Sequence, residues 1–341
     1  MKENKAHTIR DIAREAEVSI ATVSRYLNKS GYVDEETGRK IEHIIGKHGY
    51  KPNKAAQSLK TKKSMQLMLV VPDICNPFYS EMAKTVQSIA KSKGYVVTLY
   101  NTNEEPPEEI NAIKTAEQTN ADGIILCSVH VREETLKALQ NSPISKVVAN
   151  SYENCRFDSV HGVKGEGTYL TTRHLIENGH RAIAFAGGPS ASATSSRRKY
   201  GYRKAMEEAG IEYKEDYIFE MGFSVDSGFK AGKYFSTLNP LPTAICCAND
   251  LIAFGILSAF GELGIRVPED VSLTGMDNID FTNISRPRLT TATNDSVEFG
   301  RSVVNLLFDR IEGKYSGPPR EVIIPRILVV RDSVKKLDIE K

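Results

Sequence analysis

The sequence has no apolar run long enough to cross a membrane, and its charged amino terminus lacks an apolar signal segment. These absences predict a soluble, cytoplasmic protein without a membrane partner. The five cysteines form an odd set without CxxC spacing, which disfavours metal and redox chemistry. Most lie in apolar, strand-like runs, so we expect buried, reduced thiols at Cys75, Cys127, Cys155, Cys246 and Cys247.

The motifs of several enzyme classes are missing as well. The segment GFKAGKY at 228–234 lacks the Ser or Thr and the spacing of a GxxxxGK[ST] phosphate loop. The sequence also has no GxSxG elbow, no HExxH and no GxGxxG after a strand, and its seven histidines are scattered. A sugar kinase or hydrolase is therefore disfavoured, and we expect no catalytic residues, no metal site and no cofactor.

Length and charge predict a small domain beside a larger body. A chain of 341 residues with 40% hydrophobic content can bury two or three cores. Residues 1–63 hold 14 Lys and Arg against 8 Asp and Glu, whereas the remaining residues hold 31 against 35. A basic head on a mildly acidic body is the footprint of phosphate-backbone binding at one end, although a solvated basic terminus would have the same composition.

The segment TIRDIAREAEVSIATVSRYLN at 8–28 predicts two short amphipathic helices separated by a three-residue turn. Thr8 can cap the first helix with Asp11 as its capping-box partner, and Ser19 can cap the second. If Val23 faces inward, a group of polar and small side chains is left free to meet a major groove. This spacing is typical of a helix-turn-helix DNA reader, and the exposed group is Ile20, Ala21, Thr22, Ser24 and Arg25.

A third helix should run from a cap at Asp34 to a left-handed end at Gly49, which completes a small three-helix core. Pro52 then forbids continuation of that helix, and Asn53 can cap a new one. The new segment has about ten residues, too few for a helix that is stable alone. We therefore expect it to become ordered only with a partner.

Residues 8–64 and the body after them resemble the LacI/GalR family of bacterial transcription regulators over essentially the full length. The resemblance implies a homodimer on near-palindromic operator DNA, with helix-turn-helix units in the major groove and paired hinge helices in the minor groove. On matching positions, Ile20, Ala21 and Arg25 would read base edges and Leu59 would be the minor-groove wedge. The full implied DNA-binding set is Thr8, Ser19, Ile20, Ala21, Thr22, Ser24, Arg25, Asn28, Asn53, Ala56 and Leu59.

Two positions depart from the family pattern. Glu17 stands where the turn usually has Gly or Asn, and a left-handed Glu there would cost roughly 1–2 kcal/mol. Gly38 lies inside the third helix, where it costs about 1 kcal/mol relative to alanine. Neither removes a DNA contact, but both predict a head of marginal stability.

From Met65 the pattern alternates between strands and helices, which predicts parallel α/β structure in two halves, each with its own sheet. The predicted fold is a two-lobed, periplasmic-binding-protein-like body behind an all-α head. We expect a DNA-binding domain at 1–50, a hinge at 51–64 and an effector-binding, dimerising body at 65–341. The amino-terminal lobe would hold about 65–162 and 294–322, and the carboxy-terminal lobe about 163–293 and 323–333.

Ligands of such sheets bind beyond the carboxyl ends of the strands, so polar and aromatic residues that follow strands indicate a cleft. The resemblance places an effector pocket at these positions. Aromatic faces beside Asp, Asn and Arg suit a sugar ring, whose C–H face is apolar and whose hydroxyls both donate and accept. The candidates are Phe78, Tyr79, Thr194, Arg198, Phe223, Asn249 and Asp277.

The basic run Arg197–Lys199 exceeds what a neutral sugar needs. It indicates a sugar acid or sugar phosphate, unless two of the three side chains face solvent. Both readings stay open, as does the choice between an inducer, which the family favours, and a corepressor. A transport-type binding protein would share the two-sheet body, but it should carry an export signal instead of a DNA-binding head.

Overall fold

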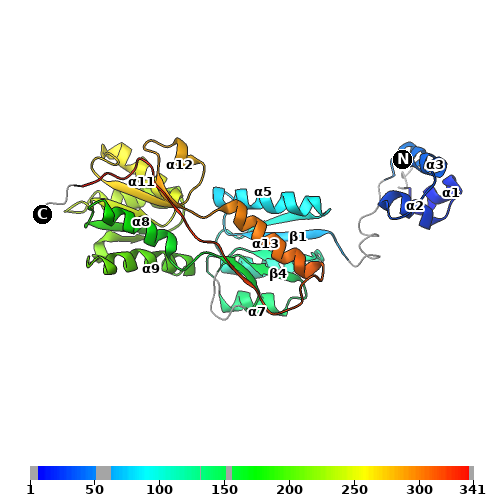
Figure 1. The fold of residues 1–341 in the computed structure, drawn as a ribbon, viewed down its shortest axis with the longest axis horizontal. Helices are drawn as coiled ribbons and strands as arrows, with labels where there is room; N and C mark the ends of the chain where they lie inside the picture. The colour runs from blue at the N-terminus through cyan, green and yellow to red at the C-terminus, as the bar shows by residue number, and fades with distance from the viewer. Residues whose placement is uncertain (1–6, 51–62, 131, 151–155, 338–341) are drawn as a thin grey trace, which may run out of the picture. The chain divides into compact units, whose positions relative to one another are not determined.

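The computed structural model describes residues 7–50, 63–130, 132–150 and 156–337 (Figure 1). Tertiary contacts divide the chain into two compact units, Met1–Ser64 and Met65–Lys341. The first unit is helical, and the second contains two separate six-stranded sheets with their helices. This architecture confirms the predicted all-α head and two-lobed α/β body. Among the described residues, no helix combines the length and the apolar character of a membrane span.

The described residues 7–50 of the head form three helices, α1 (Ile9–Ala16), α2 (Ile20–Asn28) and α3 (Glu35–His48). Their caps are those predicted. Thr8 and Asp11 form the capping box of α1, Ser19 accepts a hydrogen bond from the Thr22 backbone N–H, and Asp34 accepts one from Thr37. The core is small and consists of Ile12, Ala13, Ala16, Val23, Ile41 and Ile44.

Both unusual residues of the head have a structural explanation. Glu17 is left-handed, with φ 57°, and its carboxylate lies 3.0 Å from the Lys40 ammonium on α3. Gly38 is buried in α3, where a Cβ would lie 3.1 Å from the Tyr26 ring. The missing side chain at Gly38 therefore makes room for Tyr26 to pack between α2 and α3.

The predicted hinge residues Asn53, Ala56 and Leu59 lie outside the described residues. Their assignment stays a prediction.

The first sheet of the body has the strand order β11-β5-β4-β3-β1-β2, and all of its paired strands are parallel. Along β1, Leu67 and Leu69 enter one apolar cluster with α5 and α13, whereas Met68 and Val70 enter a second cluster with α6 and α7. Both faces of the sheet are thus covered, as parallel sheets require. The elements are β1 (Gln66–Val71), α5 (Pro77–Ser92), β2 (Val96–Asn101), α6 (Pro106–Gln118), β3 (Gly123–Leu126), α7 (Glu133–Asn141), β4 (Ser145–Val148), β5 (Asp158–His161), α13 (Ser296–Ile311) and β11 (Glu321–Ile323).

The second sheet has the order β12-β10-β9-β8-β6-β7 and is parallel except for β12, which pairs antiparallel with β10. Helix α8 packs against α9, and α10 packs against α11. The core of this lobe is one large cluster that includes Phe185, Tyr202 and Phe260. The elements are α8 (Glu166–Glu177), β6 (Ile183–Gly187), α9 (Ala193–Glu208), β7 (Ile218–Glu220), α10 (Val225–Phe235), β8 (Ala244–Cys247), α11 (Asp250–Leu263), β9 (Ser272–Asp277), α12 (Phe281–Ile284), β10 (Thr290–Thr293) and β12 (Leu328–Val329), with a 3₁₀ turn at Glu215–Tyr217.

The chain crosses between the two sheets three times. The crossings connect β5 to α8, β10 to α13, and β11 to β12, and in Figure 1 they run between the two lobes. Each crossing is short, so the relative angle of the lobes depends on a few backbone segments.

Several sequence-based expectations need correction. Strand β5 was not predicted. It has only four residues, which is too few to show a recognisable alternation of apolar and polar side chains. The strand–helix pattern of the sequence predicts a helix from Arg197 to Ala209, but α9 starts four residues earlier, at Ala193, because Ser192 caps it. Cys75 is exposed, since it lies in the turn before α5 rather than in a strand. Cys127, Cys246 and Cys247 are buried and free as expected, and Cys155 lies outside the described residues.

Candidate functional site

The outer surface of α2 presents the predicted base-reading residues. Ile20, Ala21, Arg25 and Asn28 are exposed, while Val23 on the opposite side is fully buried. Ile20 is 45% exposed, which leaves its side chain available to an apolar partner such as a thymine methyl.

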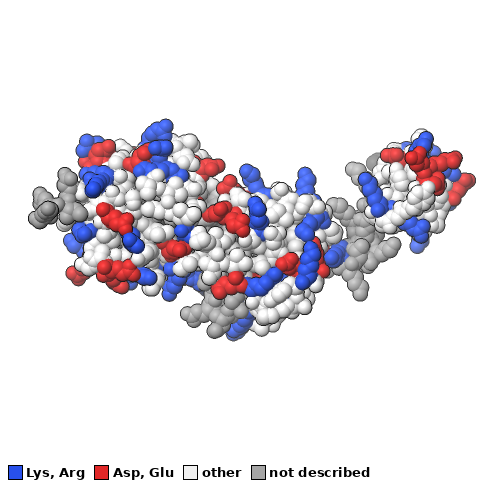
Figure 2. Space-filling model, viewed as in Figure 1, with Lys and Arg blue, Asp and Glu red and all other residues white. Residues whose placement is uncertain are grey.

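The other four predicted residues of the head, Thr8, Ser19, Thr22 and Ser24, are engaged locally. The Thr8 hydroxyl donates to Asp11 at 2.7 Å, and the Ser19 hydroxyl lies 2.9 Å from that of Thr22. Ser24 accepts a hydrogen bond from the Asn28 side chain at 3.2 Å. Thr8 and Ser19 therefore shape the helix ends, which also present backbone N–H groups to an anion. Figure 2 shows both charge signs on the visible face of the head.

In the body, two adjoining cavities of about 90 and about 40 Å³ form a cleft. Both are lined by residues of the two sheets, and they share five residues, Phe78, Tyr79, Thr194, Arg198 and Asn294. All seven predicted effector residues line the smaller cavity. The positions after predicted strands, together with the family resemblance, thus selected side chains that lie up to 199 residues apart in sequence but line one cavity.

Each element of the cleft supplies its side chains for a local reason. Asn76 caps α5, which turns Phe78 and Tyr79 of its first turn toward the smaller cavity. Ser192 caps α9, which carries Thr194 and Arg198. Asp277 ends β9 with φ 114°, a backbone conformation that L-residues rarely adopt.

Arg198 is the central cation of the smaller cavity. Its guanidinium donates to the carbonyl of Ala248 at 2.6 Å, lies 3.4 Å from the Asp277 carboxylate and is 5.3 Å from the centre of the Phe223 ring. Burial raises the pKa of Asp277, and Arg198 opposes that effect. The pair places one donor group and one acceptor group at the wall of an aromatic pocket.

Asn249 has a structural role in addition to lining the cavity. Its side-chain oxygen accepts from the Ile252 N–H at 2.9 Å and its nitrogen donates to the Phe223 carbonyl at 2.9 Å. Both ends of the amide are thereby engaged, so Asn249 links the start of α11 to the loop that carries Phe223.

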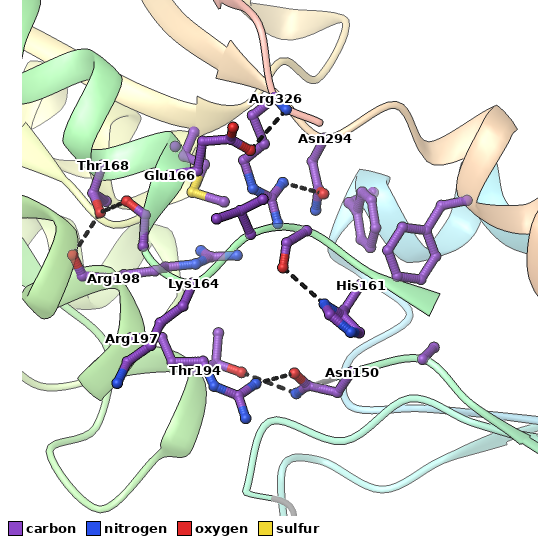
Figure 3. A pocket seen from close by; sticks show the side chains of 18 of the residues that line it. Asn150, His161, Lys164, Glu166, Thr168, Thr194, Arg197, Arg198, Asn294 and Arg326 are labelled. Carbon is purple, nitrogen blue, oxygen red and sulfur yellow. Dashed lines mark hydrogen bonds between the residues drawn. The ribbon is translucent and has the colours of Figure 1, made fainter. Parts of the chain in front are cut away.

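Sequence reasoning missed part of the larger cavity. Lys164, Asn294 and Arg326 lie on the three segments that cross between the sheets, and Glu166 is the first residue of α8. All four line the larger cavity and are labelled in Figure 3 together with His161 and Arg198. The rule that was applied to other strand ends would have found them after β5, β10 and β11. It failed because β5 was not recognised and because the sequence does not show which sheet β10 and β11 join.

The described residues contain no group of three or more His, Cys, Asp or Glu side chains that could hold a metal ion. The cleft is lined by hydrogen-bonding and charged side chains beside aromatic rings, which suits reversible binding of a polar molecule.

Two family models match the chain. "Bacterial regulatory proteins, lacI family" matches residues 8–53, which cover the helices of the head, and "Periplasmic binding protein-like domain" matches residues 172–334.

Full-length relatives decide the family. The HTH-type transcriptional repressor PurR of Histophilus somni is 33% identical over 97% of this chain and 99% of its own length, and that of Vibrio campbellii is 34% identical with the same coverage. The chain belongs to the LacI family. As a LacI-family transcriptional repressor, it is a DNA-binding regulator and not an enzyme.

Solved structures agree with this assignment of the LacI-family repressor. The lac repressor dimer bound to operator and the anti-inducer ONPF superposes with a TM-score of 0.86 at 25% identity, covering 97% of this chain and all of that one. The transcriptional regulator CelR in complex with cellobiose superposes with a TM-score of 0.73 at 27% identity, covering 96% and 99%.

Proposed function

We propose that this LacI-family repressor binds a near-palindromic operator as a homodimer and that a small sugar-like effector in the cleft changes its operator affinity. The proposal rests on one observation above all: side chains from both lobes and from the crossings between them line two adjoining cavities that share five residues. A DNA target also implies that the protein acts in the cytoplasm.

The exposed surface of α2 supports the DNA-binding half of the proposal. Arg25 has the geometry to donate two hydrogen bonds to guanine, and the exposed Ile20 and Ala21 suit thymine methyls. By the family resemblance, Asn53 starts a hinge helix in which Ala56 lies at the DNA and Leu59 wedges between base steps.

The composition of the cleft supports a sugar-like effector. Phe78, Tyr79 and Phe223 offer apolar surfaces, while Arg198 and Asp277 offer a donor and an acceptor. Two similar proteins are described with sugars: CelR with cellobiose, and a LacI-family regulator of Enterococcus faecium with ribose, which superposes with a TM-score of 0.70 at 26% identity and covers 80% of this chain and all of that one.

The three crossings can couple effector binding in the cleft to DNA binding by the head, because they set the angle between the lobes. A ligand that contacts both lobes stabilises one lobe angle over others, and a ligand that prefers the DNA-free arrangement by 1–3 kcal/mol weakens DNA binding by roughly 5- to 150-fold. We expect release of the operator by the effector, as the default of the family.

Two measurements on the full-length protein test this function. Selection of bound genomic fragments should yield a near-palindromic site, and gel-shift titration with that site should respond to at least one sugar, sugar acid or sugar phosphate. If no fragment is bound better than random competitor DNA, the DNA-binding half is wrong. If a specific site is found but no metabolite shifts its affinity, the effector half is wrong.

A further inference from the structure

The two cavities of the cleft differ in charge. Among the described residues that line the larger cavity are four cations, Lys164, Arg197, Arg198 and Arg326, and one carboxylate, Glu166. The smaller cavity has three carboxylates, Asp73, Glu104 and Asp277, and only Arg198 as a cation. The cleft therefore has one end rich in positive charge and one end rich in hydrogen-bond acceptors.

Arg326 is the most unusual of these cations. Its guanidinium donates to the side-chain oxygen of Asn294, and within the part of the chain that the structure describes no carboxylate lies within 4 Å of it. Burial and the nearby Arg198 lower the pKa of Arg326 to about 10, so the group stays charged at neutral pH. A partly buried guanidinium with one neutral partner has donors left for a ligand.

The backbone around Arg326 leaves space for this arrangement. Gly162 has no side chain, and a Cβ there would lie 2.6 Å from the Arg326 Nη2 atom. Gly167, in the first turn of α8, similarly leaves room for the Cδ atom of Arg326, at 3.1 Å from a Cβ. The positive end of α8 therefore lies at the same cavity as the guanidinium, which adds to its preference for anions.

Two further cations line the same cavity. The Arg197 Nη1 atom lies 2.5 Å from the side-chain oxygen of Asn150, which orients its guanidinium across the larger cavity from Arg326 (Figure 3). Lys164 is exposed, and its ammonium lies 4.6 Å from the centre of the Tyr200 ring. No described carboxylate lies within 4 Å of that ammonium, so it is available to a ligand that enters.

We propose that the larger cavity binds the phosphate group of a phosphorylated sugar, with Arg326 and Arg197 as its main ligands and Lys164 at its edge. The proposal rests on the proposed effector site and names the chemical class of its ligand. The sugar hydroxyls then face the acceptor-rich smaller cavity, beside Asp277 and the aromatic rings.

Charge and size favour a phosphate over a carboxylate at this site. Arg198 is paired with Asp277, and the three other cations that line the cavity, Lys164, Arg197 and Arg326, are opposed by one lining carboxylate, Glu166. This excess of positive charge matches a dianion better than a monoanion, and a guanidinium can donate two parallel hydrogen bonds to the oxygens of one phosphate. The cavity of about 90 Å³ is several times the roughly 10–15 Å³ that one water molecule requires, so it can hold a tetrahedral group.

The position of the subsite ties it to regulation. Arg326 lies between β11 and β12, Asn294 between β10 and α13, and Lys164 between β5 and α8, so each of the three crossings supplies one residue to the cavity. A phosphate held there contacts the segments that set the angle between the lobes. Binding of the phosphate therefore stabilises one angle between the lobes over others.

The first test uses matched ligands with the full-length protein. Isothermal titration at pH 7 compares ribose, glucose and fructose with their monophosphates and with gluconate and glucuronate, and inorganic phosphate serves as a competitor. At least one monophosphate should bind tenfold or more tightly than its parent sugar, and inorganic phosphate should displace it. Tighter binding of a carboxylate, or equal binding of parent and phosphate, would overturn the phosphate assignment.

The second test uses variants. Arg326→Met and Arg197→Met should each lose tenfold or more in affinity for the monophosphate, with little change for the parent sugar, because only the anionic group contacts these side chains. Lys164 is exposed, so Lys164→Met should fold normally, and its affinity for the monophosphate should fall severalfold. Lys230→Met is the matched control, since Lys230 lies on α10 and pairs with Asp226. The subsite is refuted if both arginine variants bind the monophosphate with wild-type affinity. It is also refuted if folded Lys164→Met and one of the two arginine variants do so.

The failures of the two proposals are distinguishable. If neutral sugars change operator affinity and no phosphorylated compound binds better, the phosphate subsite is wrong while the effector site stands. If no compound of any charge changes operator affinity, the regulatory function itself is wrong. If neither inorganic phosphate nor any monophosphate binds, the phosphate proposal is rejected regardless of the operator result.

Discussion

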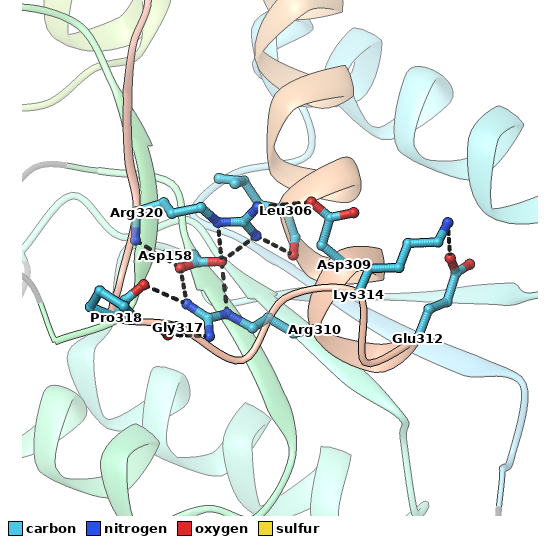
Figure 4. A network of polar contacts seen from close by, with 9 residues as sticks. All are labelled: Asp158, Leu306, Asp309, Arg310, Glu312, Lys314, Gly317, Pro318 and Arg320. Atoms are coloured by element: carbon cyan, nitrogen blue, oxygen red, sulfur yellow. Dashed lines mark hydrogen bonds and ion pairs between the residues drawn. The ribbon is translucent and has the colours of Figure 1, made fainter.

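Arg310 of α13 forms a two-point ion pair with Asp158 of β5, with nitrogen–oxygen distances of 2.6 and 3.0 Å (Figure 4). Arg320 approaches the same carboxylate at 2.8 Å, and the Asp158 side chain is fully buried. The pair joins the strand that leaves the first lobe to the helix by which the chain returns to it. It therefore ties the start of β5 to the carboxy-terminal end of α13 within the first lobe.

The Asp158 pair predicts acid sensitivity. Burial raises the pKa of Asp158, but hydrogen bonds from Arg310 and Arg320 outweigh burial and hold the pKa below its ordinary value. A carboxyl with a lowered pKa contributes stability above its unfolded-state pKa, near 3.9, and loses it as the pH falls through the folded value. Asp158→Asn should cost about 3 kcal/mol at pH 7, because two arginines lose their buried partner.

Thermal unfolding of the full-length protein between pH 3 and pH 7 checks this. Asp158→Asn should lower the melting temperature by several degrees at pH 7 and by less below pH 4. Asp226→Asn, which removes a surface i,i+4 pair with Lys230, should change it little. Equal effects of the two substitutions would contradict a special role for Asp158.

Asp250 predicts a pH effect of the opposite sign. Burial, followed by the nearby Asp277, raises its pKa to about 7, even though Thr291 donates to it at 2.6 Å and the Ile279 N–H at 3.0 Å. The folded state therefore holds a proton that the unfolded state releases, and stability declines as the pH rises from about 4 to about 7. Asp250→Asn keeps an acceptor for Ile279 but cannot ionise, so its melting temperature relative to wild type should be higher at pH 8 than at pH 5. A constant difference across that range would rule out titration of Asp250.

Arg198→Met and Asp277→Asn should each abolish the response to the effector while operator binding without effector is preserved. The two side chains face the smaller cavity and each other at 3.4 Å, and neither lies in the head. Gel-shift titrations with and without a ligand found in the panel measure both properties. A normal dose–response in either variant would remove that residue from the site.

Arg25→Ala should weaken binding to the selected operator by about 1–3 kcal/mol and relax the preference for one base pair, with little loss on random DNA. Arg39→Ala is the matched control, because Arg39 is also exposed but lies on α3, outside the recognition helix, and pairs with Glu35. Loss of affinity to the same extent on specific and random DNA would mean that Arg25 contacts phosphates only.

Leu59→Ala should weaken operator binding strongly and leave effector affinity nearly unchanged, because a wedge acts only on DNA. Leu59→Met, which keeps the apolar volume, should retain most of the affinity. Gel-shift titration measures the operator affinity of both variants. Wild-type operator affinity in Leu59→Ala would mean that Leu59 does not act as a minor-groove wedge.

The architecture and the helix ends were predictable because they depend on short-range rules. Thr8, Ser19 and Asp34 were recognised as caps from their spacing to the next helix, and alternating strands and helices predicted two sheets. The residues of the smaller cavity were also predictable from their positions after strands and from the family resemblance, since the carboxyl ends of parallel strands meet at one edge of a sheet.

What the sequence by itself determined is thus the local elements, the family pattern of the head and the residues that follow recognisable strands. Only the tertiary structure decided the larger cavity, because Lys164, Asn294 and Arg326 are more than 160 residues apart at the extremes and meet only where the chain crosses between lobes. Their charges show no pattern along the chain. Such a site depends on which strand joins which sheet, and long-range pairing of short strands leaves no periodic signal in the sequence.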